Sequence, residues 1–165
     1  MPEKQTVERA KRAKRKGKSP STESGEFVRE EMHHIREGKH GARSTKQAIA
    51  IGLSKARRAG VNLPPPERGK VSEKTRRSAE RAYHMGQRGK TKTSRRRSQT
   101  RERVLKREDR SAASRRALAK QARSAARRRT PAARSASARR AARTKRRRGR
   151  SVAARMAART RARHG

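Results

Sequence analysis

Large apolar residues are concentrated in one stretch of the chain, residues 21–63, and polar or charged residues dominate on both sides of it. Within this stretch the apolar positions first follow the i, i+4 and i+7 spacing of one helix face. The pattern predicts a helix that Ser24 caps and that ends at Gly38. We therefore expect the core here, formed by Phe27, Val28, Met32, Ile35, Ile49, Ile51, Leu53, Val61 and Leu63.

A second helix is predicted to start after Ser44, because Gln47 follows three residues later in the spacing of a capping box. Gly60 should end this helix, with Val61 packing back on its last turn as in a Schellman motif. Its inward face is expected to consist of Ile49, Leu53 and Ala56. The two helices form a predicted αα-hairpin, in which acids of the first can offset basic residues of the second: Glu30, Glu31 and Glu37 against Lys46, Lys55, Arg57 or Arg58.

Three consecutive prolines at 64–66 cannot continue a helix, so they predict a short extended linker after the hairpin. A third helix is predicted from a Ser72 cap to His84, with Gly86 as its stop. Its inward face has few apolar residues, so whether this helix docks on the hairpin stays open. The inward residues are Ala79, Ala82 and Tyr83. The predicted fold class is mostly α, with a helical hairpin or three-helix head.

The two ends of the chain are predicted to be long basic arms that are largely disordered or become helical on binding. Residues 1–20 include a short helical stretch, for which we expect no buried face. From Lys90 the chain is mostly Arg, Ala, Ser, Lys and Thr, in imperfect repeats interrupted at Thr130-Pro131 and at Gly149. Ala and Arg favour a helix, but arginines at i, i+4 spacing repel each other until counter-charge arrives. The predicted division is 1–20, 21–63, 64–89 and 90–165.

The charge of the chain indicates a polyanionic partner. Its 165 residues include 53 Lys and Arg against 13 Asp and Glu, a formal net charge of +40, and no acid follows Asp109. With 28% hydrophobic and 1% aromatic residues, the whole chain cannot close around one core. Duplex DNA carries one negative charge per ~1.7 Å, and Arg meets phosphate bidentately. The predicted nucleic-acid-binding residues are Arg95, Arg96, Arg97, Arg115, Arg116, Arg127, Arg128, Arg129, Arg139, Arg140, Lys145, Arg146, Arg147, Arg148 and Arg150, with head contacts at Arg43, Lys46, Lys55, Arg57 and Arg58.

Other classes of function are disfavoured. The absence of Cys removes thiolate metal sites and is compatible with a reducing cytosol. His33, His34 and His40 lie near Glu30 and Glu37, but their spacing matches no standard site, so we expect no metal and no cofactor. Without a nucleophile elbow or phosphate loop, we expect no enzyme. No apolar run suits a membrane or an export signal, so we expect no membrane partner and a cytoplasmic, nucleoid-associated location.

Sequence-specific readout is a separate hypothesis. The segment 25–60 has features of a helix-turn-helix with the second helix as reader, but its connection is longer than the usual three or four residues. Base stacking is disfavoured because Phe27 and Tyr83 both suit a small core, and the chain has no other Phe, Tyr or Trp. A hairpin that merely packs two helices together is the preferred interpretation, and a homo-oligomer formed through the head stays open.

One stretch carries a resemblance to known proteins. It runs as Gly25-Glu26-Phe27-Val28-Arg29-Glu30-Glu31-Met32, then as Arg36-Glu37-Gly38-Lys39-His40-Gly41-Ala42-Arg43-Ser44, and on to Ala59-Gly60-Val61 and the triple proline. This pattern resembles a family of small basic proteins from soil and plant-associated bacteria that are sometimes labelled DNA-binding or plasmid stabilisation proteins. The resemblance implies no active site. The tail is similar in composition to bacterial proteins that imitate the linker-histone tail, although it is richer in Arg.

Two hypotheses for the function follow. In the first, a histone-like, nucleoid-associated protein binds and compacts DNA without sequence specificity, and its arms wrap or bridge duplexes. In the second, the chain is an RNA- or ribosome-associated basic protein. The Ala-rich, repeat-like tail favours duplex DNA, because extensions that follow irregular RNA usually contain more Gly and aromatic residues.

Overall fold

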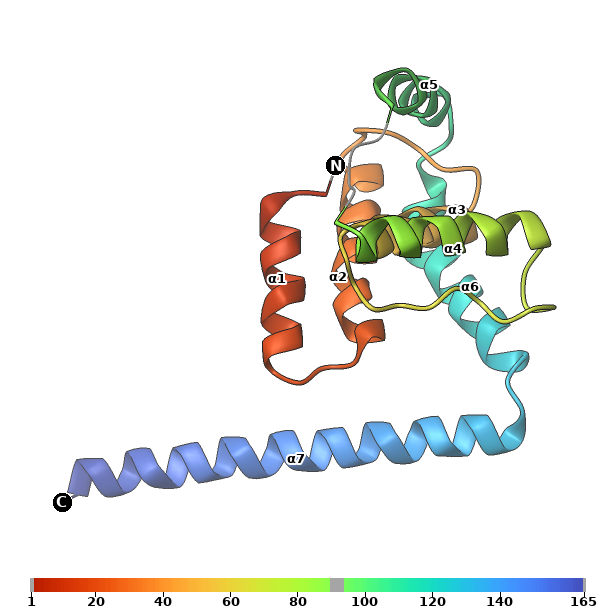
Figure 1. Cartoon of the computed structure of the whole chain (residues 1–165). Helices are drawn as coiled ribbons and strands as arrows, with labels where there is room; N and C mark the ends of the chain where they lie inside the picture. The colour runs from red at the N-terminus through yellow and green to blue at the C-terminus, as the bar shows by residue number, and fades with distance from the viewer. Residues whose placement is uncertain (1, 90–93, 165) are drawn as a thin grey trace. The chain divides into compact units, whose positions relative to one another are not determined.

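A computed structural model describes residues 2–89 and 94–164; for residues 147, 148, 150, 151, 153–155, 157, 158, 160, 161, 163 and 164 it describes the backbone alone (Figure 1). The described residues form helices and no strand, which confirms the predicted mostly α class. The chain divides into two units, residues 1–121 and 122–165. The elements are α1 (Lys4–Arg15), α2 (Pro20–Arg36), α3 (Thr45–Arg58), α4 (Glu73–Gln87), α5 (Arg95–Lys106), the 3-10 turn η1 (Ser111–Ala113), α6 (Arg115–Arg127) and α7 (Pro131–His164).

Helix α2 begins earlier than the sequence pattern predicts. Its N-cap is Ser19, whose Oγ accepts a hydrogen bond from the Thr22 amide at 3.4 Å, and Pro20 occupies the first helical position. The prediction that Ser24 caps this helix is therefore wrong. Ser24 is buried inside the helix, where its hydroxyl donates to the Pro20 carbonyl at 2.8 Å. Gly38 does end the helix, with a φ of 78° that favours glycine.

The local signals predicted for α3 are confirmed. Ser44 Oγ accepts from the Gln47 amide at 3.2 Å, as in a capping box. At the other end, the Gly60 amide donates to the Arg57 carbonyl and the Val61 amide donates to the Ala56 carbonyl, both at 3.1 Å. This pair of bonds is the predicted Schellman motif.

The buried face of α3 consists of small residues. Ala48, Gly52 and Ala56 are buried, whereas Ile49 and Leu53, which the pattern placed inward, are only half-buried. The reason is a close crossing of α2 over α3: a Cβ added at Gly52 would lie 2.7 Å from Val28 Cα. Only a glycine allows the two backbones this approach, and the larger side chains flank the contact instead of filling it.

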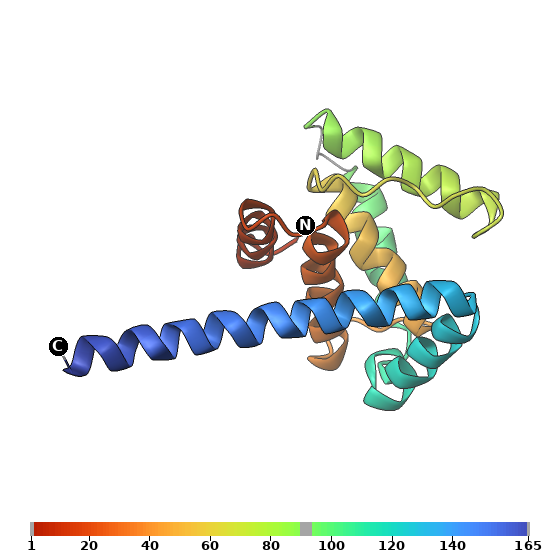
Figure 2. The same ribbon diagram turned by 90° about the horizontal axis from the view of Figure 1, so that it is seen from below.

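Helices α1 to α4 pack in chain order, α1 on α2, α2 on α3 and α3 on α4 (Figure 2). The expectation that residues 1–20 bury no face is wrong, because Thr6 and Ala10 of α1 are buried and Ala10 joins a cluster with Phe27. An ion pair between Arg9 Nε and Glu26 Oε2 at 2.9 Å also links α1 to α2.

Helix α4 starts at its predicted cap, since Ser72 Oγ accepts from the Thr75 amide at 3.3 Å. The predicted stop is wrong: Gly86 lies inside the helix, buried where its backbone meets the carbonyl of Arg57 on α3. Gly89, with a φ of 67°, follows the true end of α4. On the same side, the Tyr83 hydroxyl donates to Asn62 Oδ1 at 2.8 Å. The helix therefore docks on α3, a point that the sequence left open.

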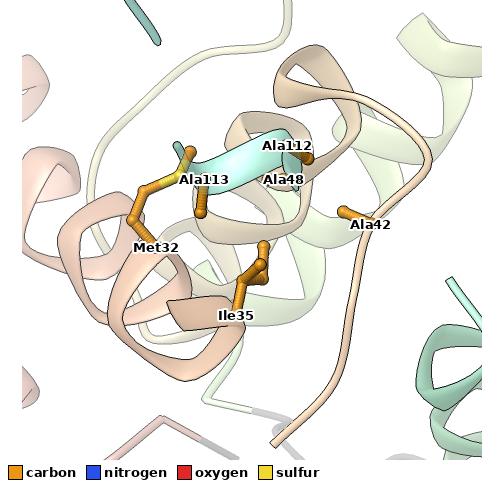
Figure 3. Packing of buried hydrophobic residues seen from close by; sticks show 6 residues of the cluster. All are labelled: Met32, Ile35, Ala42, Ala48, Ala112 and Ala113. Carbon is orange, nitrogen blue, oxygen red and sulfur yellow. The ribbon is translucent and has the colours of Figure 1, made fainter. Parts of the chain in front are cut away.

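Residues 105–118 return to the head, although the sequence pattern assigns them to the tail. Ala112 and Ala113 of η1 complete a buried cluster with Met32, Ile35 and Ala48 (Figure 3). Backbone bonds secure the return, since Gly41 donates to the Leu105 carbonyl at 2.8 Å and Ala42 donates to the Asp109 carbonyl at 2.9 Å. The division of the chain into four parts stays a prediction. The contacts described here join residues 105–113, which that division places in the tail, to the helices of the head.

The second unit contains the end of helix α6 and the whole of helix α7. Pro131 starts the helix and Thr130 Oγ1 caps it by accepting from the Ala133 amide at 3.2 Å. The helix continues through Gly149, where the sequence repeats are interrupted. Among the described residues, no helix combines the length and apolar character that crossing a membrane requires.

Candidate nucleic-acid interface

Helix α5 presents a strongly basic surface. None of its residues is buried, and Arg95, Arg96 and Arg97 in its first turn are exposed. A shallow pocket lies along this helix, lined by Ser94, Arg96, Arg97, Thr100 and Arg101. Guanidinium groups beside hydroxyl donors are the chemistry that recognises a phosphate group.

The C-terminal end of α3 extends this positive surface. The pKa of Arg58 is lowered, first by burial and then by the nearby charge of Arg101 on α5. Among the described residues, no acceptor bonds to the buried Arg58 Nε. Two guanidinium groups that repel each other raise the local positive potential, and a bound anion would relieve the repulsion.

The five basic residues predicted as head contacts fall into two groups. Arg43 and Lys46 are exposed and Arg58 is half-buried. Arg57, by contrast, is 6% exposed, its pKa is lowered by burial, and its guanidinium donates to the carbonyls of Leu63 and Pro64 at 3.1 and 3.2 Å. This side chain fixes the start of the triple-proline linker.

Lys55 is also occupied within the head. Its Nζ lies 2.7 Å from Glu31 Oε2 and 3.4 Å from Glu30 Oε1, and both carboxylates are buried. This pairing matches the predicted offset of acids on α2 by a base on α3. Lys55 and Arg57 therefore stabilise the head, and the accessible members of the predicted set are Arg43, Lys46 and, in part, Arg58.

The predicted binding residues of the C-terminal part are exposed wherever their side chains are described. Those with described side chains are Arg115, Arg116, Arg127, Arg128, Arg129, Arg139, Arg140, Lys145 and Arg146. The side chains of Arg147, Arg148 and Arg150 lie outside the described residues, although their backbone belongs to α7. Because the sequence has no acid after Asp109, these residues have no carboxylate partner within their own segment.

Sequence reasoning missed the contribution of Arg101 and Thr100, which join the N-terminal arginines of α5 through one helical turn. The i, i+4 spacing of Arg97 and Arg101 was the available signal. The juxtaposition of Arg58 and Arg101 had no such signal, because the two residues are distant in the chain and the packing of the head brings them together.

Comparisons with known proteins give one match. Residues 3–67 match the model of a family of unknown function (DUF6496). The matched region spans α1, α2, α3 and the triple proline, and it ends before α4 and all of the predicted binding residues from 95 onwards. No curated protein and no solved structure matches the chain. The conclusion about function therefore depends on the residues themselves.

Proposed function

We propose that this protein binds duplex DNA through its phosphates, without reading base sequence, and compacts it as a histone-like, nucleoid-associated protein. The observation that carries the proposal is the segment 110–165, which has twenty-one Lys and Arg and no acid. Every such side chain that the structure describes in α6 and α7 is exposed. Cationic side chains without carboxylate partners displace the counterions that are condensed on the phosphates of DNA. The release of these counterions supplies most of the free energy of non-specific binding.

The arrangement of α7 supports compaction as well as binding. Successive residues of an α-helix are rotated by about 100°, so Arg134, Arg139 and Arg140 project at roughly 0°, 140° and 240° around the axis. The 34 residues of the helix extend over roughly 50 Å. A rod with guanidinium groups on every side contacts more than one duplex at a time, which brings the duplexes together.

The C-terminal helices reach their full helicity on DNA. Ala and Arg have high helix propensity, but like charges at i, i+3 and i+4 destabilise the free helix. Phosphates remove that repulsion, so adding duplex DNA increases helicity. The circular dichroism signal of the whole protein at 222 nm should strengthen when DNA is added at low salt, once the DNA contribution is subtracted. A free protein whose helicity already equals that of the complex would contradict this coupling.

The salt dependence of affinity tests the proposal. Log affinity should fall linearly with log salt at about −0.9 per phosphate contacted, or roughly −8 and steeper for about nine contacts. Deleting residues 122–165 removes seventeen Lys and Arg and leaves Ala112, Ala113 and Leu118 in the head. The slope of this truncated protein should be markedly shallower. An unchanged slope would show that the C-terminal part is not the main binding surface.

Matched variants separate charge from length. Replacing Arg127, Arg128, Arg129, Arg139 and Arg140 by Gln should make the slope shallower by about 4.5, whereas Lys at the same five positions should preserve it. Native and random DNA should bind within about tenfold of each other, because phosphate contacts carry no base information. Displacement of bound DNA by much lower concentrations of structured RNA would instead favour the RNA-associated alternative.

A further inference from the structure

Three side chains with metal-binding atoms converge where α2 ends. Glu31 and His34 share one face of α2 at i, i+3 spacing, and His40 lies in the loop that follows. One ligand atom from each residue lies within 4.8 Å of those of the other two. The expectation of no metal site rested on the spacing of His33, His34 and His40 near Glu30 and Glu37. Glu31, which the helical spacing places on the same face as His34, was not among these residues.

The carboxylate of Glu31 is buried without adequate partners. Its side chain is 0% exposed, and neither oxygen accepts a hydrogen bond from the described residues. Lys55 Nζ lies 2.7 Å from Oε2, but this ion pair lacks hydrogen-bond geometry. A buried carboxylate is unfavourable unless both its charge and its lone pairs are satisfied. Oε1, on the side away from this ion pair, is therefore available to a further cation.

The distance between Glu31 Oε1 and His40 Nε2 fits a shared metal ion. It is 3.4 Å, longer than the usual N–H···O hydrogen bond. Two ligands bound to one zinc ion at ~2.0–2.1 Å in tetrahedral geometry lie roughly 3.3 Å apart. The observed spacing is thus that of two neighbouring ligands of a tetrahedral ion.

Both imidazole rings have the outer hydrogen bonds that are typical of metal ligands. His40 Nδ1 lies 3.0 Å from the Gly41 carbonyl and donates to it, which leaves the lone pair on Nε2, the atom that faces Glu31. His34 Nε2 lies 2.8 Å from Glu3 Oε1 and donates to this carboxylate, which leaves the lone pair on Nδ1. A carbonyl or carboxylate behind each ring fixes its tautomer and orientation, as it does for histidines that bind zinc.

The local charge also suits a cation, despite the net charge of the chain. Glu30, 2% exposed, is adjacent to Glu31 and Glu3 contacts His34, and these three acids outnumber Lys39 and Lys55, the two lysines paired with them. The rings of His34 and His40 are 13% and 14% exposed, which leaves room for ion entry and for a water ligand. Two imidazoles, one carboxylate and a water form a common tetrahedral zinc environment.

We propose that Glu31, His34 and His40 bind one Zn²⁺ ion, with water as the fourth ligand, and that the bound ion stabilises the head. The ion joins the end of α2 to the loop at His40. That loop continues into Gly41 and Ala42, whose amides hold the carbonyls of Leu105 and Asp109. Zinc binding therefore stabilises the return of residues 105–113 to the core, and it is independent of the DNA contacts proposed above.

The test uses the full chain, stripped with a chelator and then titrated with Zn²⁺ by calorimetry. We expect one equivalent to bind and the melting temperature of the head to rise by several degrees at saturation, because the ion binds only the folded state. Tyr83 reports this melting, since it is the only tyrosine and the chain has no tryptophan. Co²⁺ as a substitute ion should give the visible absorption bands of a tetrahedral site.

Matched histidine variants make the test decisive. His34→Ala and His40→Ala should each weaken Zn²⁺ binding by 100-fold or more, while His33→Ala, an exposed neighbour on α2, should leave it unchanged. Circular dichroism before metal addition checks that each variant is folded. If a ligand variant fails to fold, the Co²⁺ spectrum of the wild type decides. The proposal is overturned by an octahedral Co²⁺ spectrum, by no saturable binding at micromolar Zn²⁺, or by equal affinity in His40→Ala and the wild type.

Discussion

Gly52→Ala tests the closest helix contact in the head. A Cβ at this position would lie 2.7 Å from Val28 Cα and 3.0 Å from Val28 Cγ2, whereas carbon atoms in contact normally stay at least ~3.5 Å apart. Helices α2 and α3 would have to separate by about 0.8 Å, and the small alanines around the crossing cannot fill the gap. Overpacking of this kind destabilises by about 1–3 kcal/mol.

The opposing effect is helix propensity, since Ala is favoured over Gly by about 1 kcal/mol inside a helix. Gly25→Ala measures that effect alone, because Gly25 is exposed within α2 and a Cβ there would meet nothing within 4 Å. We expect Gly25→Ala to stabilise the head by up to about 1 kcal/mol and Gly52→Ala to destabilise it by about 1–2 kcal/mol. The difference between the two variants isolates the steric term.

Urea unfolding of the full chain, followed by Tyr83 fluorescence, measures both variants in the head. The tyrosine reports this unit because its hydroxyl is bonded to Asn62. The reasoning is refuted if Gly52→Ala is as stable as the wild type or gains as much as Gly25→Ala. Either result would mean that the α2–α3 crossing is looser than 2.7 Å implies.

Two further predictions concern the returning segment and the start of α4. Ala113→Asp should destabilise the head by about 3 kcal/mol or more, because Ala113 is 0% exposed and a charge there has no partner. The control Ala122→Asp, at an exposed position, should change stability little in the same urea assay. Hydrogen bonds from Arg76 hold the pKa of Glu73 at about 2 instead of 4.5, so its ionised form stabilises α4 above pH 4.5 and this contribution is lost as the pH falls towards 2. The melting temperatures of wild type and Glu73→Gln should therefore differ at neutral pH and converge at about pH 2, and a gap that persists there would contradict this.

Features that depend on a few neighbouring residues were predictable from the sequence. The Ser44 cap and the Gly60-Val61 end of α3 were both found, because each motif closes its hydrogen bonds within one or two turns. The start of α2 was misplaced because Ser19 and Ser24 are both good caps. Pro20 was the discriminating signal, since proline suits the first helical position that follows a cap.

Features that depend on the approach of two backbones were not predictable in this way. Ala112 and Ala113 fill the core although they carry little apolar surface, because the glycine at 41 lets the chain at 108 and 109 come close. The inward face of α3 was likewise misplaced: a hydrophobicity pattern favours Leu53, but the crossing at Gly52 determines which residues are buried. A close backbone contact of this kind requires a glycine, which the sequence shows. The sequence does not indicate which residue packs against that glycine.

Predicting the candidate binding residues required the fold least, because a uniform excess of arginine is a property of composition. Only the structure, however, shows which basic residues stabilise the head and which are accessible. Lys55 and Arg57 belong to the same helix as Arg58, yet the first pairs with buried acids and the second holds backbone carbonyls. Charge alone could not separate these roles, since all three side chains are cations at neutral pH.

The distribution of acids explains how one chain combines a folded head with a polycationic tail. All 13 acids lie at or before Asp109, and inside the head Glu26 is paired with Arg9 while Glu30 and Glu31 are paired with Lys55. Under the proposed function, the cations of residues 110–165 are available to phosphates because this segment has no Asp or Glu that competes for them. A deletion after Asp109 would follow this charge boundary, but it would also remove Ala112 and Ala113 from the core and mix unfolding with loss of charge. A deletion after Gln121 separates the two effects, since it retains the whole first unit.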